Sequence, residues 1–121
     1  MPGQNLSSGG IMHTLDVSMG LHNLNGNEQL YNKLLRRFAD DNTQMGQQIR
    51  AAMDAGDKET AIRLVHTLKG LAATLGAPEL SSVALAVEQI LKSSGTLPGG
   101  GMDTLEAELG LVLAAIEARL A

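Results

Sequence analysis

One histidine near the middle of this 121-residue sequence has neighbours suited to chemistry at an exposed imidazole. Lys69 and Gly70 follow His66 at spacings of three and four residues, which a helix brings to one face. The lysine ammonium can meet an anionic group attached to the imidazole, and the glycine leaves space beside the ring. A glycine inside a helix costs about 1 kcal/mol relative to alanine, so its presence favours close approach by another molecule. The pattern indicates a nucleophilic imidazole that is used by a partner protein.

The apolar spacing around His66 predicts which way its ring points. On a helix with about 100° per residue, a group of apolar residues falls opposite His66. These predicted core positions are Ala61, Leu64, Leu68, Leu71 and Leu75. His66 is therefore expected to point outward, toward solvent or a partner. The predicted docking face around it consists of Glu59, Ile62, Arg63, Gly70 and Ala73.

Helical periodicity also precedes this segment. A short helix is predicted near residues 15–24. Asn27 is a suitable N-cap for a longer helix whose apolar stripe runs to Phe38. A third, shorter periodic segment begins near Met45 and ends near Gly56.

The remaining boundaries follow from capping residues. Asp57 is the predicted N-cap of the helix that carries His66, and Gly76 is its predicted C-terminal glycine. Pro78 suits the first turn of the next helix. Asp103 and Glu106 have the spacing of a capping box and predict the start of the last helix.

Amphipathic helices joined by short connections must bury their apolar stripes against one another. We therefore expect an all-α fold, an up-and-down antiparallel four-helix bundle with a short extra N-terminal helix. Residues 1–10 are expected to be a flexible leader or a remnant of an expression vector, and residues 11–121 to form the bundle domain. Residues 93–101 contain four glycines and are predicted to be a loop.

The composition excludes several classes of function. Without cysteine, the chain has no disulfide, thiolate metal site or cysteine nucleophile. A net charge of −4 and only two aromatic residues argue against nucleic-acid binding. No apolar run approaches the roughly 18 residues of a membrane span, and the first ten residues lack the features of a signal peptide. The expected setting is cytoplasmic, with no direct membrane contact.

The segment His66-Thr67-Leu68-Lys69-Gly70-Leu71-Ala72-Ala73 resembles the histidine-containing phosphotransfer (HPt) domain of bacterial phosphorelays. Further similar positions lie upstream, between Asp16 and Phe38 and at Gly56-Asp57, and downstream at Val87-Glu88. Leu71 departs from the family pattern, which more often has a small residue there. The apolar periodicity predicts that Leu71 faces the core, so the departure is expected to affect packing and not the site.

The resemblance implies that His66 accepts a phosphoryl group from an aspartyl-phosphate on one receiver domain and passes it to another. It also implies that Lys69 orients the phosphoryl group, and that Gly70 and Ala73 keep the approach clear. No nucleotide motif or acidic cluster accompanies His66. We therefore expect a carrier and not an enzyme, with no cofactor of its own and with magnesium bound to the partner. The expected partners are receiver domains of response regulators or of a hybrid sensor kinase, and the chain is expected to be a monomer.

Three other interpretations stay open at this point. The chain could be the phospho-accepting domain of a chemotaxis-type histidine kinase, loaded from ATP by a kinase domain. It could be an interaction module that is not phosphorylated. A metal-binding bundle is disfavoured, because such proteins direct their ligands inward and the Glu-x-x-His pattern is absent. The residues do not decide between a free-standing protein and an excised domain, or which imidazole nitrogen reacts.

Overall fold

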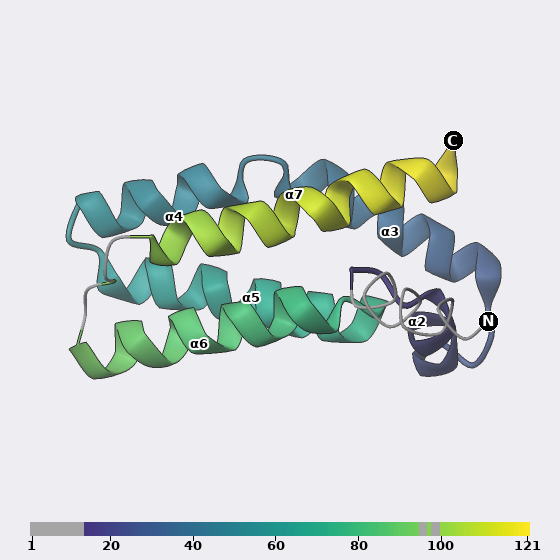
Figure 1. Ribbon diagram of the computed structural model, residues 1–121, viewed down its shortest axis with the longest axis horizontal. Helices are drawn as coiled ribbons and strands as arrows, with labels where there is room; N and C mark the ends of the chain where they lie inside the picture. Colours follow the sequence, from purple (N-terminus) through teal and green to yellow (C-terminus); the bar gives the residue numbers. More distant parts are fainter. Residues whose placement is uncertain (1–13, 95–96, 98–99) are drawn as a thin grey trace, which may run out of the picture.

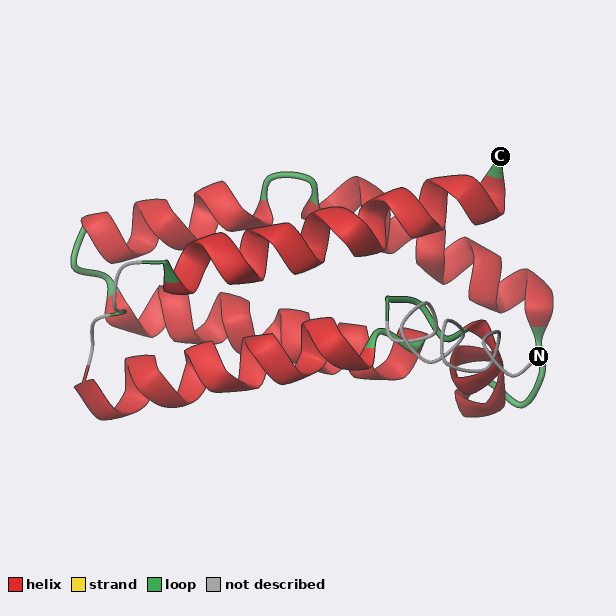
Figure 2. Ribbon diagram, in the orientation of Figure 1, coloured by secondary structure: helices red, strands yellow, loops and turns green. Residues whose placement is uncertain are grey.

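A computed structural model describes residues 14–94, 97 and 100–121 of the chain. All regular secondary structure in these ranges is helical (Figure 2). The helices are α2 (Val17–Asn23), α3 (Glu28–Asn42), α4 (Met45–Asp54), α5 (Lys58–Leu75), α6 (Pro78–Ser94) and α7 (Gly101–Leu120). The predicted leader lies outside the described residues, as does part of the predicted loop. Of that loop, residues 93–94 belong to the end of α6, and Gly101 belongs to α7.

The helices form a four-helix bundle with α2 at one end (Figure 1). Helices α3 and α4 follow one another along one edge and together take the place of one helix of the bundle. Helices α5, α6 and α7 are its other helices. Both α3 and α4 pack against α5 and α7, and α5 packs most extensively against α6. The short helix α2 packs against α3 and α5. The predicted all-α bundle with a short N-terminal helix is confirmed.

Polar side chains cap the helices where the sequence predicts it. The side chain of Asn27 accepts a hydrogen bond from the backbone N–H of Leu30 at 3.0 Å, at the start of α3. Asp57 accepts from the N–H of Thr60 at 3.2 Å, at the start of α5. These caps satisfy N–H groups that have no partner within the helix, and they fix where each helix begins.

The predicted capping box at the start of α7 is wrong. Helix α7 begins at Gly101, before Asp103, and its N-cap is Gly100. Asp103 and Glu106 instead bind Arg50 on α4, at 2.8 and 2.7 Å. The guanidinium offers charge-assisted hydrogen bonds from a neighbouring helix, so both carboxylates join α4 to α7 instead of capping α7.

The buried face of α5 differs from the prediction by a small rotation. Its buried residues are Ala61, Val65, Leu68, Ala72 and Leu75. Leu64 is only half-buried, and Leu71 is 41% exposed. Because α6 packs along α5, the buried stripe includes Val65 and Ala72 in place of Leu64 and Leu71. The prediction that Leu71 faces the core is therefore wrong.

The carboxyl end of α5 is held by side chains from α3 and α2. Tyr31 on α3 is fully buried, and its hydroxyl donates a hydrogen bond to the carbonyl of Leu75 at 2.8 Å. The side-chain amide of Asn23 on α2 donates to the carbonyl of Thr74 at 3.0 Å. The last carbonyls of a helix have no partner within it, so these bonds anchor the helix that carries His66.

Gly76 ends α5 in a conformation that requires glycine. Its φ is 90°, and its carbonyl accepts a 2.6 Å hydrogen bond from the N–H of Asp16. A Cβ at this position would overlap the backbone carbonyl of Asp16. We expect Gly76→Ala to lower the free energy of unfolding by at least about 2 kcal/mol, as measured by urea denaturation.

Gly56→Ala is the matched control for this change. Gly56 also has a positive φ, of 73°, but a Cβ there would meet no atom within 4 Å. This variant is expected to lower the free energy of unfolding by only about 1 kcal/mol, the cost of placing alanine at a positive φ. Equal losses in the two variants would show that the contact with Asp16 is not what makes Gly76 necessary.

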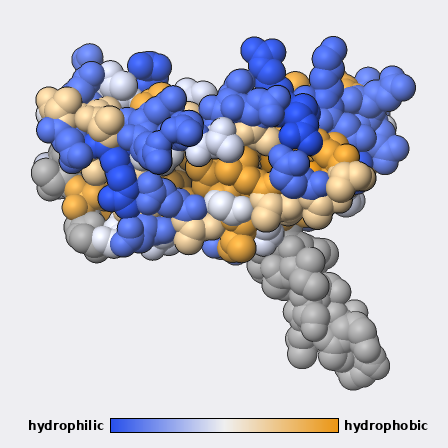
Figure 3. All heavy atoms as spheres, turned by 90° about the horizontal axis from the view of Figure 1, so that it is seen from above, coloured by the Kyte–Doolittle hydropathy of each residue, from blue (hydrophilic) through white to orange (hydrophobic). Residues whose placement is uncertain are grey.

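The surface carries charged and apolar areas side by side. The view in Figure 3 looks onto the α4 and α7 side and shows apolar areas among hydrophilic side chains. Large exposed apolar residues occur on several helices, among them Leu71 on α5, Leu85 on α6 and Leu111 on α7. Among the described residues, no helix combines the length and apolar character needed to cross a membrane.

Candidate functional site

His66 lies in the middle of α5 with its ring on the outside of the bundle. Its side chain is 63% exposed, as predicted. The inner edge of the ring faces α6, where Nδ1 lies 2.8 Å from Oε2 of Glu88. One edge of the imidazole is thus held by the protein, and the rest is open to solvent.

Glu88 is a buried carboxylate at the centre of a charged cluster. Its side chain is 2% exposed. Lys69 on α5 donates to Oε1 at 2.6 Å, and Lys92 on α6 lies 3.2 Å from Oε2. Hydrogen bonds from Lys69, and then from His66 and Lys92, outweigh burial and lower the pKa of Glu88 to about 2. Glu88 is therefore ionised at neutral pH.

The charge of Glu88 decides which nitrogen of His66 carries the proton. An ionised carboxylate can only accept hydrogen bonds, so the short contact to Oε2 requires a proton on Nδ1. In a neutral imidazole the lone pair then lies on Nε2. Since Nδ1 is engaged by Glu88, the free lone pair belongs to the other ring nitrogen, which is suited to nucleophilic attack.

Lys69 is bound more closely to the protein than the sequence suggests. It lies on the same side of α5 as His66, but its side chain is only 26% exposed and its ammonium bonds directly to Glu88. Lys69 and His66 therefore meet through Glu88, each on a different carboxylate oxygen. Lys69 fixes the carboxylate that in turn fixes the ring.

Two comparisons with known proteins show the family and the fold. The sequence model of the family described as "Hpt domain" matches residues 33–118. This chain belongs to the Hpt domain family. The fold is also similar to the crystal structure of the HPT domain from a sensor hybrid histidine kinase of Shewanella, with a TM-score of 0.78 and 24% identity over 90% of this chain and 95% of that one. No curated protein matches the sequence.

Membership of this family gives the chain a general role. Hpt domains are histidine phosphotransfer modules of phosphorelays, and they interact with receiver domains. They carry phosphoryl groups and are not catalysts. Among the described residues of this Hpt domain, no group of three histidine or carboxylate side chains is placed to hold a metal ion.

The structure places the predicted docking residues of this Hpt domain at the surface of α5. Glu59, Arg63, Gly70 and Ala73 are exposed, whereas Ile62 is half-buried and packs against the core. All five share the outer side of the helix with His66, as predicted from the spacing. Their contact with a partner stays a prediction.

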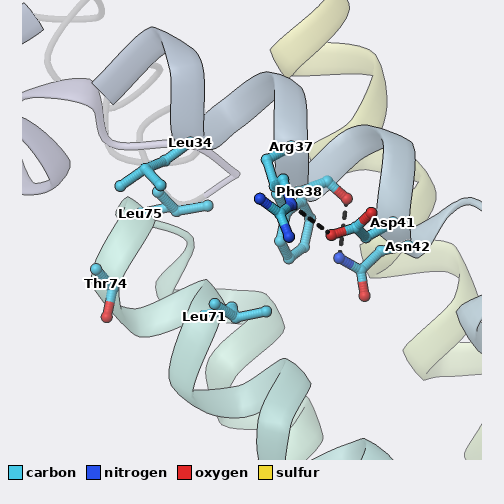
Figure 4. A pocket seen from close by; sticks show the side chains of 8 residues that line it. All are labelled: Leu34, Arg37, Phe38, Asp41, Asn42, Leu71, Thr74 and Leu75. Carbon is cyan, nitrogen blue, oxygen red and sulfur yellow. Dashed lines mark hydrogen bonds and ion pairs between the residues drawn. The ribbon is translucent and has the colours of Figure 1, made fainter. Parts of the chain in front are cut away.

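A groove lies between α3 and α5, and none of the predicted docking residues lines it. It has a volume of about 300 Å³ and lies beside the exposed Leu71 (Figure 4). Its lining consists of Leu34, Arg37, Phe38, Asp41, Asn42, Leu71, Thr74 and Leu75. The departure at Leu71 therefore adds exposed apolar surface to this groove.

Sequence reasoning did not assign roles to Glu88 or Lys92. The signal was present, because Glu88 follows Leu80 and Ala84 at intervals of four residues and so occupies a core position of its helix. A carboxylate in such a position must find cationic or hydrogen-bonding partners. Lys92 is one turn further along α6 and supplies one of them.

Replacing Gly70 is expected to raise the stability of the fold and to slow phosphoryl transfer. A Cβ at Gly70 would meet no atom within 4 Å, so Gly70→Ala is expected to raise the free energy of unfolding by about 0.5–1 kcal/mol. The added methyl group beside His66 is expected to slow phosphoryl transfer from a receiver domain severalfold. Thermal unfolding and a timed transfer assay measure the two effects.

Gly110→Ala on α7 is the matched control. A Cβ at Gly110 also meets no atom within 4 Å, so the same gain in stability is expected without a change in transfer rate. A Gly70→Ala protein that transfers as fast as Gly110→Ala would contradict a role for Gly70 in partner approach.

Proposed function

We propose that Nε2 of His66 accepts a phosphoryl group from an aspartyl-phosphate on a receiver domain and passes it to the aspartate of a second receiver. The observation that carries this proposal is the exposed ring whose Nδ1 is bound to an ionised, buried Glu88. In the first step a bond forms between Nε2 and phosphorus, and the bond from phosphorus to the aspartate oxygen breaks. The aspartate leaves as a carboxylate, and the second step is the reverse reaction on another receiver.

Glu88 favours this step electrostatically. As the N–P bond forms, the imidazole loses electron density and develops positive charge while Nδ1 keeps its proton. A carboxylate held 2.8 Å from Nδ1 stabilises this charge, and it needs no rearrangement because Lys69 already holds it in place. Lys69 therefore acts as a positioning residue for Glu88.

The protein's own contribution to the chemistry is small in this account. Phosphoryl transfer passes through a loose transition state, in which catalysis depends on positioning and on charge stabilisation. We assign the magnesium ion and most of the catalytic groups to the receiver domain. The chain then serves as a phosphoryl carrier that needs no cofactor of its own.

The receiver is proposed to dock on the outer side of α5. Gly70 and Ala73 leave room for its backbone, Ile62 offers apolar surface, and Glu59 and Arg63 supply polar contacts. Such a combination of a small apolar area with a charged rim is typical of a transient interface.

The test of this function is transfer from a receiver domain loaded with acetyl phosphate. Mixed with the chain in Mg²⁺, the loaded receiver is expected to give a phosphorylated chain whose label is lost in acid and kept in alkali. A second, unloaded receiver should then remove the label. If no receiver donates, while a chemotaxis-type kinase with ATP does, the kinase-domain alternative replaces this proposal.

A further inference from the structure

Two lysines share one carboxylate beside His66, and they do so on different oxygens. Lys69 binds Oε1 of Glu88 at 2.6 Å, whereas Lys92 lies 3.2 Å from Oε2, the oxygen that also accepts from Nδ1 of His66. The ammonium of Lys92 is therefore on the imidazole side of the carboxylate. Lys92 is also much more exposed, at 58% against 26% for Lys69.

The charges of this cluster do not balance before phosphorylation. One lysine is enough to neutralise Glu88, so the second leaves a surplus positive charge when His66 is neutral. A phosphoryl group on Nε2 brings nearly two negative charges to the open edge of the ring. The positive charge that the ring carries while Nδ1 keeps its proton offsets only one of them, so a further cation beside the phosphoryl group is favoured.

Resting on the proposed function, we propose that Lys92 is the residue that binds the phosphoryl group of phosphorylated His66. Its ammonium moves from Oε2 of Glu88 to a phosphoryl oxygen, while Lys69 stays on Oε1. The exchange leaves Glu88 with partners on both oxygens, because Nδ1 of the ring continues to donate to Oε2.

The burial of the two lysines decides which one moves. Moving Lys69 would leave Oε1 of a nearly fully buried carboxylate without a partner, which is costly. Moving Lys92 costs little, since its contact is longer, its side chain is 58% exposed and its four-carbon stem is flexible. The other charged side chains on the outer side of α5 near His66 are Arg63 and Glu59. Arg63, three residues before His66, is the competing cation.

A small donor tests this proposal without a cognate receiver. Phosphoramidate transfers its phosphoryl group to an imidazole nitrogen with release of ammonia, and ³¹P NMR then follows the ionisation of the bound phosphoryl group with pH. A nearby cation favours the dianion and lowers the titration midpoint. Lys92→Gln is expected to raise this midpoint by about 0.2–0.7 pH, the range expected for an exposed ion pair. Lys92→Arg is expected to keep the wild-type midpoint.

Lys33→Gln on α3 removes the same charge outside the cluster and is expected to leave the midpoint unchanged. In 1 M salt the difference between wild type and Lys92→Gln should shrink, because exposed charges are screened. A midpoint in Lys92→Gln equal to that of wild type, or a rise found only in Arg63→Gln or Lys69→Gln, overturns the role of Lys92. Uptake of a phosphoryl group by His66→Gln from a loaded receiver domain would instead overturn the proposed function itself.

Discussion

Replacing His66 with glutamine is expected to abolish phosphorylation of the chain by a loaded receiver domain. The amide nitrogen of glutamine can still donate to Glu88, but the side chain has no nucleophilic nitrogen. Because the His66 side chain is 63% exposed, the free energy of unfolding should change by less than about 0.5 kcal/mol. Intact-protein mass spectrometry measures the first effect and urea denaturation the second.

His22→Gln is the control for this result. His22 is an exposed histidine on α2, and its replacement should leave phosphorylation at the wild-type level. A phosphorylated His66→Gln protein, or loss of the label in His22→Gln, would mean that the acceptor has been assigned to the wrong side chain.

Replacing Glu88 with glutamine is expected to affect both stability and transfer. The pKa of Glu88 in the folded protein, about 2, is below the ordinary value of 4.5. The ionised group therefore stabilises the fold fully above pH 4.5, and this stabilisation is lost as the pH falls toward 2. At pH 7 we expect Glu88→Gln to lower the free energy of unfolding by about 2–3 kcal/mol. This is less than the free energy that corresponds to the whole pKa change, because both lysines that bind Glu88 are partly exposed to solvent.

The two unfolding curves should converge as the pH approaches 2, where Glu88 loses its charge in wild type. The same variant should accept a phosphoryl group about tenfold to a hundredfold more slowly, by analogy with the range seen when the carboxylate partner of a metal-ligating histidine is replaced. Glu106→Gln, which breaks the bonds to Arg50 on another side of the bundle, is the control and should transfer normally. A constant stability difference between pH 7 and pH 2 would contradict the ionised cluster.

Much of the fold follows from local sequence signals. The helix boundaries are marked by residues that act on their own helix. The side chains of Asn27 and Asp57 accept a hydrogen bond from a backbone N–H of the first turn, and Gly76 ends its helix with a positive φ. The prediction failed at Asp103 and Glu106, whose partner Arg50 comes from a distant helix. A local motif cannot reveal a competing partner that only the packed bundle brings close.

The site could be predicted in part for the same reason. The outward direction of His66 and its place beside Lys69 are properties of a single helix, and the structure confirms them. The contact of both residues with Glu88 depends on how α6 packs against α5, which the periodicity of α5 alone does not contain. The packing of α6 against α5 also sets which residues of α5 are buried, and it leaves Leu71 exposed.

The identity of the phosphorylated nitrogen tests the account most directly. In the chain labelled with ¹⁵N-histidine and phosphorylated by phosphoramidate, two-bond ¹H–¹⁵N correlations together with ³¹P coupling distinguish the two ring nitrogens. The bond between Nδ1 and Glu88 predicts phosphorus on Nε2 and a proton on Nδ1. Phosphorus on Nδ1 of His66 would contradict the account, because Glu88 would then hold the wrong edge of the ring.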